Sequence, residues 1–373
     1  MLRDIEALVT CESPSTDLAA VAESARVVAQ VGSSRLGAEP EFLEVDGRTH
    51  LRWRFGDGPS RVLVLGHHDT VWPLGSLLTH PFAIDDGVLR GPGCFDMKAG
   101  VVMAFHAIAA LPDRSGITLL ITGDEELGSP SSRALIEDES RGCAAALVLE
   151  ASADGGALKV ERKGVSLYEI EVHGRAAHAG LEPGRGVNAT LEIAHHALAS
   201  AALADDAAGT TVTPTLMVAG TSTNTVPAHA RLSVDVRTRA GAEQERVDKA
   251  VHALRPVLDG ARLEIRGGPN RPPLERSASD ELFAHAEVIA QRLGQPPLRG
   301  VGVGGASDGN FTAGVGTPTL DGLGAVGGGA HADDEHVLVA ELEPRTELVR
   351  TLLAELLTSD ATKAAVTAGT DRP

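Results

Sequence analysis

Cysteine and long apolar segments are both scarce in this chain of 373 residues. Its cysteines are Cys11, Cys94 and Cys143, and a set that is odd and sparse provides no disulfide framework and fits a reducing compartment. No apolar run approaches the roughly 20 residues of a membrane span. Acidic residues interrupt the N-terminal stretch, which argues against a signal peptide. We therefore expect a soluble, cytoplasmic protein without a membrane span.

Basic residues are also in short supply. The chain has 33 Lys and Arg residues against 51 Asp and Glu residues, which gives a formal net charge of −18. A protein that binds nucleic acid needs a basic surface, and an anionic membrane surface does not attract an acidic protein. The charge balance therefore argues against both partners. The simplest explanation of the acidic charge is that it keeps the protein soluble.

What the chain does contain is typical of a globular protein: 43% hydrophobic and 23% charged residues, in a length sufficient for two domains. Over residues 1–162, short apolar runs alternate with helical patterns, which predicts an α/β domain with a mostly parallel sheet covered by helices on both faces. A helix over residues 20–31 is expected to end at Gly32. The expected strands cover residues 62–65, 117–122 and 145–149. One helix is expected over residues 96–111, and residues 132–136 are expected to begin another.

The pattern changes after Lys163. The expected order becomes β-α-β-β-α-β, which is that of a ferredoxin-like α+β unit. Prolines at residues 269–273 indicate a linker back to the first domain. We therefore expect a domain at residues 163–268, inserted into one formed by residues 1–162 and 269–373. The elements of the insert are expected at residues 165–172, 187–203, 212–218, 230–237, 242–258 and 262–265.

The stretch at residues 62–71 combines a buried strand with polar chemistry. Four apolar residues and Gly66 are followed by His67, His68 and Asp69. Open α/β sheets bind their ligands at the carboxyl ends of the strands, and an imidazole next to a carboxylate is typical of a metal ligand held by an acid. A polar turn after a core strand is an equally good interpretation of this motif alone.

More acids follow the other expected strands or lie in glycine-flanked loops. Any one of them is more often a solvated loop residue, but a repeated set is harder to explain in that way. Imidazoles and carboxylates together suit zinc, and two zinc ions roughly 3.5–4 Å apart need a bridging carboxylate. The candidate residues are His67, Asp69, Asp96, Glu125, Glu126, Glu150 and His331.

Two glycine-rich segments, residues 302–309 and 322–329, raise nucleotide binding as a rival interpretation. Neither segment has the lysine and Ser/Thr of a P-loop, and neither has a dinucleotide fingerprint between a strand and a helix. Tight turns and a close backbone approach to a site explain them better.

Taken together, the motifs resemble the di-zinc exopeptidase family that includes aminoacylase, succinyl-diaminopimelate desuccinylase and carboxypeptidase G. They run in the family's order over nearly the whole chain. The matching stretches are GHHDTV at residues 66–71, GPGCFDMK at 91–98, GDEELG at 123–128, Glu150, GRAAHAG at 174–180, NTVP at 224–227, DVR at 235–237 and HADDE at 331–335.

The resemblance implies a set of metal ligands. His67 and Glu150 would complete one site, Glu126 and His331 the other, and Asp96 would bridge the two metals. The cofactors implied are two Zn²⁺ ions per subunit, for which Co²⁺ or Mn²⁺ could substitute. The domain of residues 1–162 and 269–373 would be the catalytic one, and residues 163–268 would form a lid and dimerisation domain.

The resemblance also implies other roles. Asp69 would orient the imidazole of His67, and Glu125 would be the general base that takes a proton from the bridging water. His178 would reach the active site of the partner subunit in a homodimer and stabilise the oxyanion. Arg237 and Asn224 would hold the terminal carboxylate of the substrate.

The implied function is hydrolysis of an amide in a small N-acyl amino acid or peptide, with release of a C-terminal amino acid. Glu150 and Arg271 favour the glutamate carboxypeptidase type, because Arg271 aligns with an arginine that binds an acidic side chain in carboxypeptidase G. The alternative enzyme is an N-acyl-amino-acid deacylase or desuccinylase with the same metal chemistry. A metal-binding scaffold without catalysis would lack the base or the bridging acid, yet Glu125 and Asp96 are both present.

Overall fold

The computed structural model describes residues 1–358 and separates into two units. The first unit consists of Met1–Glu161, Leu274–Val303 and the chain from Ser307 onward. The second consists of Arg162–Pro273 with Gly304–Ala306. Within residues 1–358, no helix is both long and apolar enough to cross a membrane.

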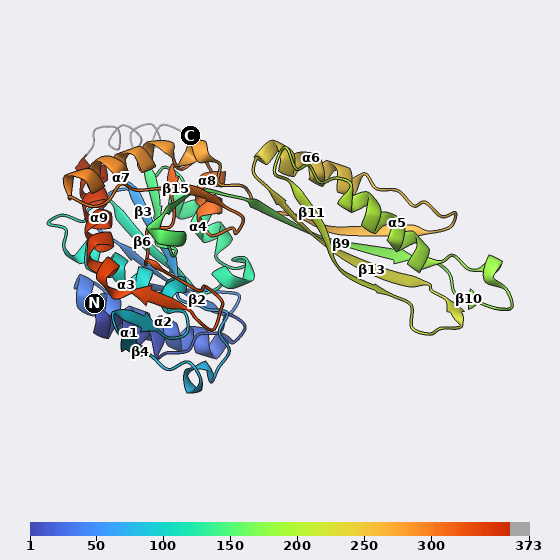
Figure 1. The fold of residues 1–373 in the computed structure, drawn as a ribbon, viewed down its shortest axis with the longest axis horizontal. Helices are drawn as coiled ribbons and strands as arrows, with labels where there is room; N and C mark the ends of the chain where they lie inside the picture. The colour runs from blue at the N-terminus through green and yellow to red at the C-terminus, as the bar shows by residue number, and fades with distance from the viewer. Residues whose placement is uncertain (359–373) are drawn as a thin grey trace. The chain divides into compact units, whose positions relative to one another are not determined.

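The apolar runs of the first unit form a sheet in which four of six strands are parallel. Every residue of β3, β6 and β7 is buried, as expected of strands covered on both faces. The predicted α/β class with a mostly parallel sheet is therefore confirmed (Figure 1). In sheet order the strands are β1 (Glu41–Val45), β2 (Arg48–Arg54), β6 (Ile117–Thr122), β3 (Val62–His67), β7 (Ala145–Val148) and β16 (Thr319–Leu320).

Helices cover both faces of this sheet. Alternate strand residues point to opposite faces: Val62 and Val64 pack in the core with α1, α2, α3, α7 and α9, whereas Leu63 and Leu65 pack against α4 and α8. The helices are α1 (Leu2–Val9), α2 (Leu18–Leu36), α3 (Ala99–Ala109), α4 (Arg133–Ser140), α7 (Asp280–Arg292), α8 (Gly309–Gly314) and α9 (Val339–Thr358). Smaller strands are β4 (Ala83–Asp85), β5 (Val88–Arg90), β8 (Leu158–Arg162), β15 (Gly300–Val303), β17 (Gly327–Gly328) and β18 (His336–Leu338).

The prediction that the second helix ends at Gly32 is wrong. Helix α2 continues to Leu36 and ends at Gly37, which has the left-handed conformation (φ 64°) common at helix ends. Gly32 lies inside the helix because the helix passes close to Trp53: a Cβ atom at Gly32 would lie 2.7 Å from the Trp53 ring. Gly32 therefore does not end the helix, and its lack of a side chain allows the helix to pack against Trp53.

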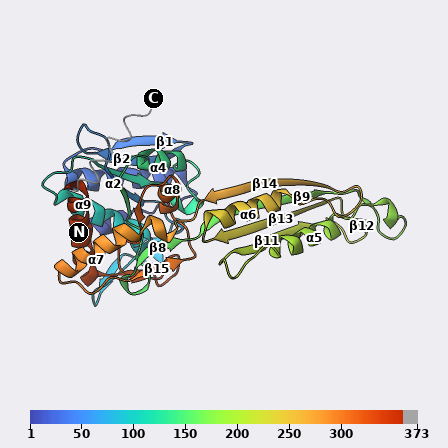
Figure 2. The same ribbon diagram turned by 90° about the horizontal axis from the view of Figure 1, so that it is seen from above.

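The second unit has the β-α-β-β-α-β order of a ferredoxin-like fold. Its antiparallel sheet has the strand order β11-β13-β9-β14, and alternate apolar residues such as Ile170 and Val234 form its core with α5 and α6 (Figure 2). The opposite face of the sheet carries charged side chains. The elements are β9 (Gly164–His173), α5 (Ala189–Ala201), β11 (Thr211–Ala219), β13 (His229–Thr238), α6 (Gly241–His252) and β14 (Arg262–Arg271), with a ribbon of β10 (Ala177–His178) and β12 (Thr225–Val226).

The segment predicted as a linker at residues 269–273 begins inside a strand. Strand β14 pairs with β9 as far as Arg271, although the register shifts between Pro269 and Arg271. This bulge accommodates the proline, which cannot donate to the ladder. The prolines predicted that the strand ends before residue 269, but β14 continues past Pro269 with one irregularity in its pairing with β9.

Candidate active site

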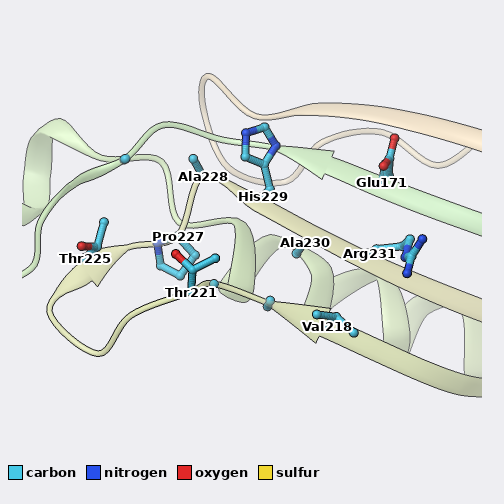
Figure 3. Close-up of a pocket in the computed structure, with 12 residues that line it drawn as sticks. Glu171, Val218, Thr221, Thr225, Pro227, Ala228, His229, Ala230 and Arg231 are labelled. Carbon is cyan, nitrogen blue, oxygen red and sulfur yellow. The ribbon is translucent and has the colours of Figure 1, made fainter.

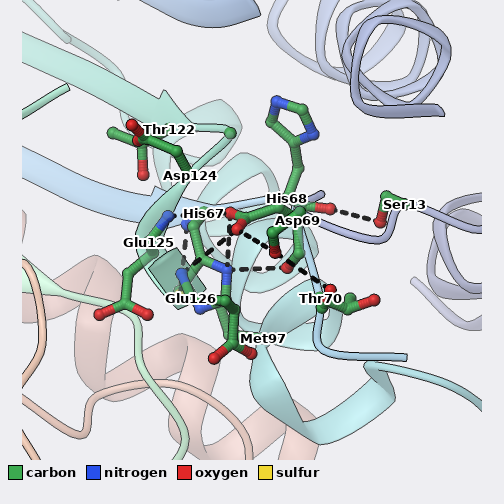
Figure 4. A network of polar contacts seen from close by, with 12 residues as sticks. Ser13, His67, His68, Asp69, Thr70, Met97, Thr122, Asp124, Glu125 and Glu126 are labelled. Atoms are coloured by element: carbon green, nitrogen blue, oxygen red, sulfur yellow. Dashed lines mark hydrogen bonds and ion pairs between the residues drawn. The ribbon is translucent and has the colours of Figure 1, made fainter. Parts of the chain in front are cut away.

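The candidate metal ligands of the first unit come from the carboxyl ends of neighbouring parallel strands. His67 is the last residue of β3, Glu125 and Glu126 form the turn after β6, and Glu150 follows β7. Because β6 and β7 both pair with β3 in parallel, their ends share one edge of the sheet (Figure 4). The sheet topology thus brings residues far apart in sequence into one cluster.

Asp96 lies between two imidazoles. His67 Nε2 is 3.3 Å from Asp96 Oδ1 and 3.6 Å from Glu150 Oε1. On the other side, His331 Nε2 is 3.4 Å from Asp96 Oδ2 and 3.1 Å from Glu126 Oε1. The structure therefore brings all five sequence-derived ligand candidates together, in two groups that share the Asp96 carboxylate.

Two buried atoms of this cluster fit a metal ion. His67 Nε2 and Asp96 Oδ1 are buried and make no hydrogen bond with any other residue that the structure describes. A buried polar atom without a partner is costly, and a cation between the imidazole and the carboxylates would satisfy both atoms. Nitrogen and carboxylate oxygen donors in this combination suit zinc.

Asp69 holds the imidazole of His67 and also the turn after β6. His67 Nδ1 donates to the Asp69 backbone oxygen at 3.0 Å and lies 3.4 Å from its carboxylate, so that Nε2 faces the other acids. The Asp69 carboxylate also accepts hydrogen bonds from the backbone N–H groups of Glu125 and Glu126, both at 3.2 Å, and from Ser15 Oγ at 2.6 Å. One side chain thus fixes a ligand and the candidate base.

The neighbouring histidine points elsewhere. The ring of His68 points away from the ring of His67 (Figure 4). Its Nε2 donates to the Thr49 backbone oxygen at 3.1 Å, and its Nδ1 lies 3.2 Å from Ser24 Oγ. Burial lowers the pKa of His68 to about 4, so the ring is neutral at physiological pH. Of the two adjacent imidazoles, only that of His67 faces the carboxylates.

The carboxylates change the pKa values of the site. Hydrogen bonds to Asp96 and Glu126 raise the pKa of His331 to about 10. Burial opposes protonation of His67, but Asp69 and Asp96 raise its pKa well above the usual value. The cluster therefore attracts positive charge. His331 also has a left-handed backbone (φ 62°), a conformation that is rare for non-glycine residues and concentrated at functional sites.

Glu335 is a residue of the site to which the sequence motifs assigned no role. Its buried carboxylate accepts hydrogen bonds from the backbone N–H groups of Gly93 (3.0 Å), Phe95 (2.9 Å) and Asp96 (3.0 Å) and from Trp72 Nε1 (2.6 Å). The signal available in the sequence was an acid at the end of the HADDE stretch. Its backbone partners could not be read from the sequence.

The loop that Glu335 holds explains a further correction. A helix was predicted from Asp96, but α3 begins at Ala99, and both Asp96 (φ −114°, ψ 94°) and Met97 (φ −133°, ψ 34°) have non-helical backbones. The Asp96 N–H donates to Glu335 in place of a carbonyl of a preceding helical turn. The bridging candidate therefore lies in a loop ahead of the helix.

In the second unit, His178 and Asn224 lie on the short β10–β12 ribbon. His178 Nδ1 accepts hydrogen bonds from the backbone N–H groups of Gly180 and Leu181, both at 3.1 Å. Nε2 is consequently the ring atom that carries the proton and can donate. The backbone oxygen of Asn224 accepts from Ala179 at 2.9 Å, which joins the two loops.

Arg237 and Arg271 flank β9. Both pair with Val165, one from β13 and the other from β14. The Arg237 guanidinium makes two hydrogen bonds to the Asp235 carboxylate, at 2.8 and 2.9 Å. A substrate carboxylate at Arg237 would therefore have to share that guanidinium with Asp235.

Comparison with known proteins identifies the family. The model of peptidase family M20/M25/M40 matches residues 63–355. Carboxypeptidase G2 from Pseudomonas sp. (strain RS-16) is 30% identical over 318 residues, which cover 81% of this chain and 75% of that protein. Succinyl-diaminopimelate desuccinylase from Xanthomonas euvesicatoria pv. vesicatoria (strain 85-10) is 31% identical over 343 residues, which cover 85% and 89%.

Solved structures share the fold. Aminopeptidase PepT from Bacillus cereus has a TM-score of 0.73 at 23% identity and covers 95% of this chain and 97% of its own. The M20 family metallo-carboxypeptidase Sso-CP2 from Sulfolobus solfataricus also has a TM-score of 0.73, at 16% identity, and covers 95% and 98%. Because the family model matches most of the chain, this protein belongs to peptidase family M20/M25/M40 and is a hydrolase of the metallopeptidase type.

Proposed function

We propose that this protein is a di-zinc amide hydrolase that releases a C-terminal amino acid from a small N-acyl or peptidyl substrate. The supporting observation is that Asp96 faces His67 with one carboxylate oxygen and His331 with the other. This arrangement suits a carboxylate that bridges two metal ions. His67 and Glu150 would hold one ion and Glu126 and His331 the other, and Co²⁺ or Mn²⁺ could replace zinc.

Glu125 is the proposed general base. Its backbone is fixed by Asp69, and its carboxylate belongs to a group with His67 and Glu150 whose ligand atoms lie within 4.8 Å of one another. Since Glu125 is assigned to neither metal site, its carboxylate can take a proton from the attacking water and pass it to the leaving amine. Bound zinc would supply acidity to the water and polarise the scissile carbonyl.

The released amino acid is proposed to be glutamate. Support comes from the likeness to carboxypeptidase G2 and from two arginines, Arg237 on β13 and Arg271 on β14, the strands that flank β9. Guanidinium groups bind carboxylates in a planar, bidentate way. Asn224 lies toward the other end of the sheet from these arginines, so its amide would reach the same substrate group from the partner subunit. The 31% identity to a succinyl-diaminopimelate desuccinylase supports removal of an N-acyl group as the second candidate.

The second unit is proposed to act as a lid and to form a homodimer. The edge strand β11 exposes about half of each of Leu216, Met217 and Val218, and α5 exposes 74% of Leu198. An apolar edge strand favours pairing with a second chain. In the dimer, the Nε2–H group of His178 would donate to the oxyanion in the partner's site. The three free cysteines support the cytoplasm as the location.

A substrate panel tests the reaction. The zinc-loaded protein is assayed for release of amino acid from N-acyl substrates that end in glutamate, glutamine or alanine, and from N-succinyl diaminopimelate. A preference for C-terminal glutamate would support the carboxypeptidase reaction, and a preference for the succinyl substrate the alternative. If fully loaded protein hydrolyses no amide of either class, the proposed function is wrong.

A further inference from the structure

The helix-free face of the second unit carries a separate group of possible metal ligands. Glu171 and His173 project from β9, and Glu264 projects from the neighbouring strand β14. His173 Nε2 lies 3.7 Å from Glu264 Oε2 and 4.0 Å from Glu171 Oε2. Each residue offers a donor atom, and all three atoms lie within 4.8 Å of one another.

This group repeats a feature of the first unit's centre. His173 Nε2, like His67 Nε2, is a buried imidazole nitrogen that has no hydrogen-bond partner in the described part of the chain. Both face two carboxylates, at 3.7 and 4.0 Å for His173 and at 3.3 and 3.6 Å for His67. Donor atoms that each lie about 2.0–2.2 Å from a tetrahedral zinc ion are about 3.3–3.6 Å apart, so the donors around His173 would have to move slightly closer together to bind one.

Nearby arginines distinguish the group of Glu171, His173 and Glu264 from the centre of the first unit. Arg266 hydrogen-bonds Glu264 through Oε1, so that Oε2 is the oxygen that faces His173. Arg266 Nη2 lies 3.6 Å from Glu171 Oε2, and Arg262 Nη1 lies 3.8 Å from Glu264 Oε2. These positive charges partly neutralise the carboxylates. They should weaken the binding of a cation relative to the first unit's centre.

A pocket lies beside this group of residues. Glu171 and His229 line a pocket of 380 Å³ (Figure 3). The His229 ring stands edge-on to that of His173, with the ring centres 5.4 Å apart. His173, Glu171 and Glu264 are each partly exposed, so that an ion can enter from solvent.

We propose that Glu171, His173 and Glu264 form a zinc site of lower affinity than the first unit's centre. Water or the imidazole of His229 would complete the coordination. The ion would cross-link β9 to β14, two strands otherwise held together by backbone hydrogen bonds and by ion pairs such as that of Arg266 with Glu171. This proposal does not depend on the catalytic reaction.

Zinc titration of the full-length protein tests the site. Calorimetry and equilibrium metal analysis should show a further, weaker zinc ion per chain after the first unit's centre is filled. His173→Ala and Glu264→Gln should each weaken this component by roughly 10-fold or more and leave the tighter binding unchanged. His252→Ala is the matched control, because it removes an exposed histidine of α6 in the same unit and should change neither component.

A second readout locates the ion. In protein labelled at histidine, the ring signals of His173 should shift only when zinc exceeds the amount bound by the tighter centre. The proposal is wrong if the native protein takes up no weaker zinc ion, or if that ion still binds in folded His173→Ala and Glu264→Gln variants.

Discussion

The two units of this chain hold their buried carboxylates in different ways. In the first unit, Asp96 faces two imidazoles, and one of its oxygens is buried without a hydrogen bond to any described residue. In the second unit, buried Glu192 accepts hydrogen bonds from the backbone N–H groups of Val257 and Leu258 and lies 2.8 Å from His196 Nε2. Protein groups satisfy Glu192, whereas one oxygen of Asp96 has no hydrogen-bond partner among residues 1–358. Burial of an acid alone therefore does not indicate a metal site.

The largest effect is expected at the candidate base of the first unit. Glu125→Gln keeps the size of the side chain but removes the proton acceptor, and kcat should fall by roughly 10²–10⁴-fold while metal content stays constant. Kinetics of amino-acid release and metal analysis of the same samples measure both quantities. Glu126→Gln is the matched control and should lose zinc. The reverse pattern would mean that the two roles have been exchanged.

A somewhat smaller effect is expected at His178 in the second unit. Its loss removes one donor to the oxyanion, so His178→Ala should lower kcat by about 10²–10³-fold with metal content unchanged. When this variant is mixed with inactive Glu125→Gln and subunits exchange, one site of each mixed dimer has both an intact base and an intact histidine. Activity should then return. Exchanged but inactive mixtures would show that the histidine does not act across subunits.

Glu335 tests whether the first unit's centre depends on its supporting hydrogen bonds. Glu335→Gln removes the charge that holds the Asp96 loop, and zinc affinity should fall by roughly 10–100-fold. Excess zinc should restore most of the activity, a recovery not expected if the variant merely unfolded. Glu341→Gln, an exposed acid at the start of α9, is the control. Unchanged zinc affinity in Glu335→Gln would contradict the assigned role.

The smallest effect is expected at Glu192. Burial would raise the pKa of this carboxyl, but hydrogen bonds from Val257, Leu258 and His196 bring it below the usual 4.5. The stabilising contribution is therefore fully present above about pH 4.5 and is lost as the pH falls through the folded-state value. Glu192→Gln should lower the free energy of unfolding by about 1.5 kcal/mol at pH 7, and its difference from the native protein should shrink in acid. Denaturant titrations at pH 7 and pH 3.5 measure this, and zinc binding should not change.

Much of the fold follows from local patterns in the sequence. The runs at residues 62–65 and 145–149 are apolar throughout, the run at 117–122 is apolar apart from Thr118 and Thr122, and all three became fully buried parallel strands. Because parallel strands present their carboxyl ends at one edge, the polar residues after each run could be expected to meet there. This reasoning and the family motifs were sufficient to predict that His67, Glu126 and Glu150 lie close together.

What could not be predicted depends on contacts between distant segments. Gly32 was predicted to end a helix because the sequence does not show that Trp53 packs against this position. Glu335 binds backbone groups some 240 positions earlier in the chain, and no side-chain pattern indicates such partners. The group of Glu171, His173 and Glu264 depends on the register of β9 against β14, which the sequence alone does not specify.

His331 and Glu335 are only four positions apart in the sequence, which limits how the loop between them can vary. One end of the five-residue stretch presents an imidazole to Asp96, and the other end accepts the Asp96 N–H. The side chains of Ala332, Asp333 and Asp334 between them are exposed and contact neither Asp96 nor its loop partners. An inserted or deleted residue, however, would withdraw the imidazole or the carboxylate from its partner. The length of this loop is therefore more strictly constrained than its composition.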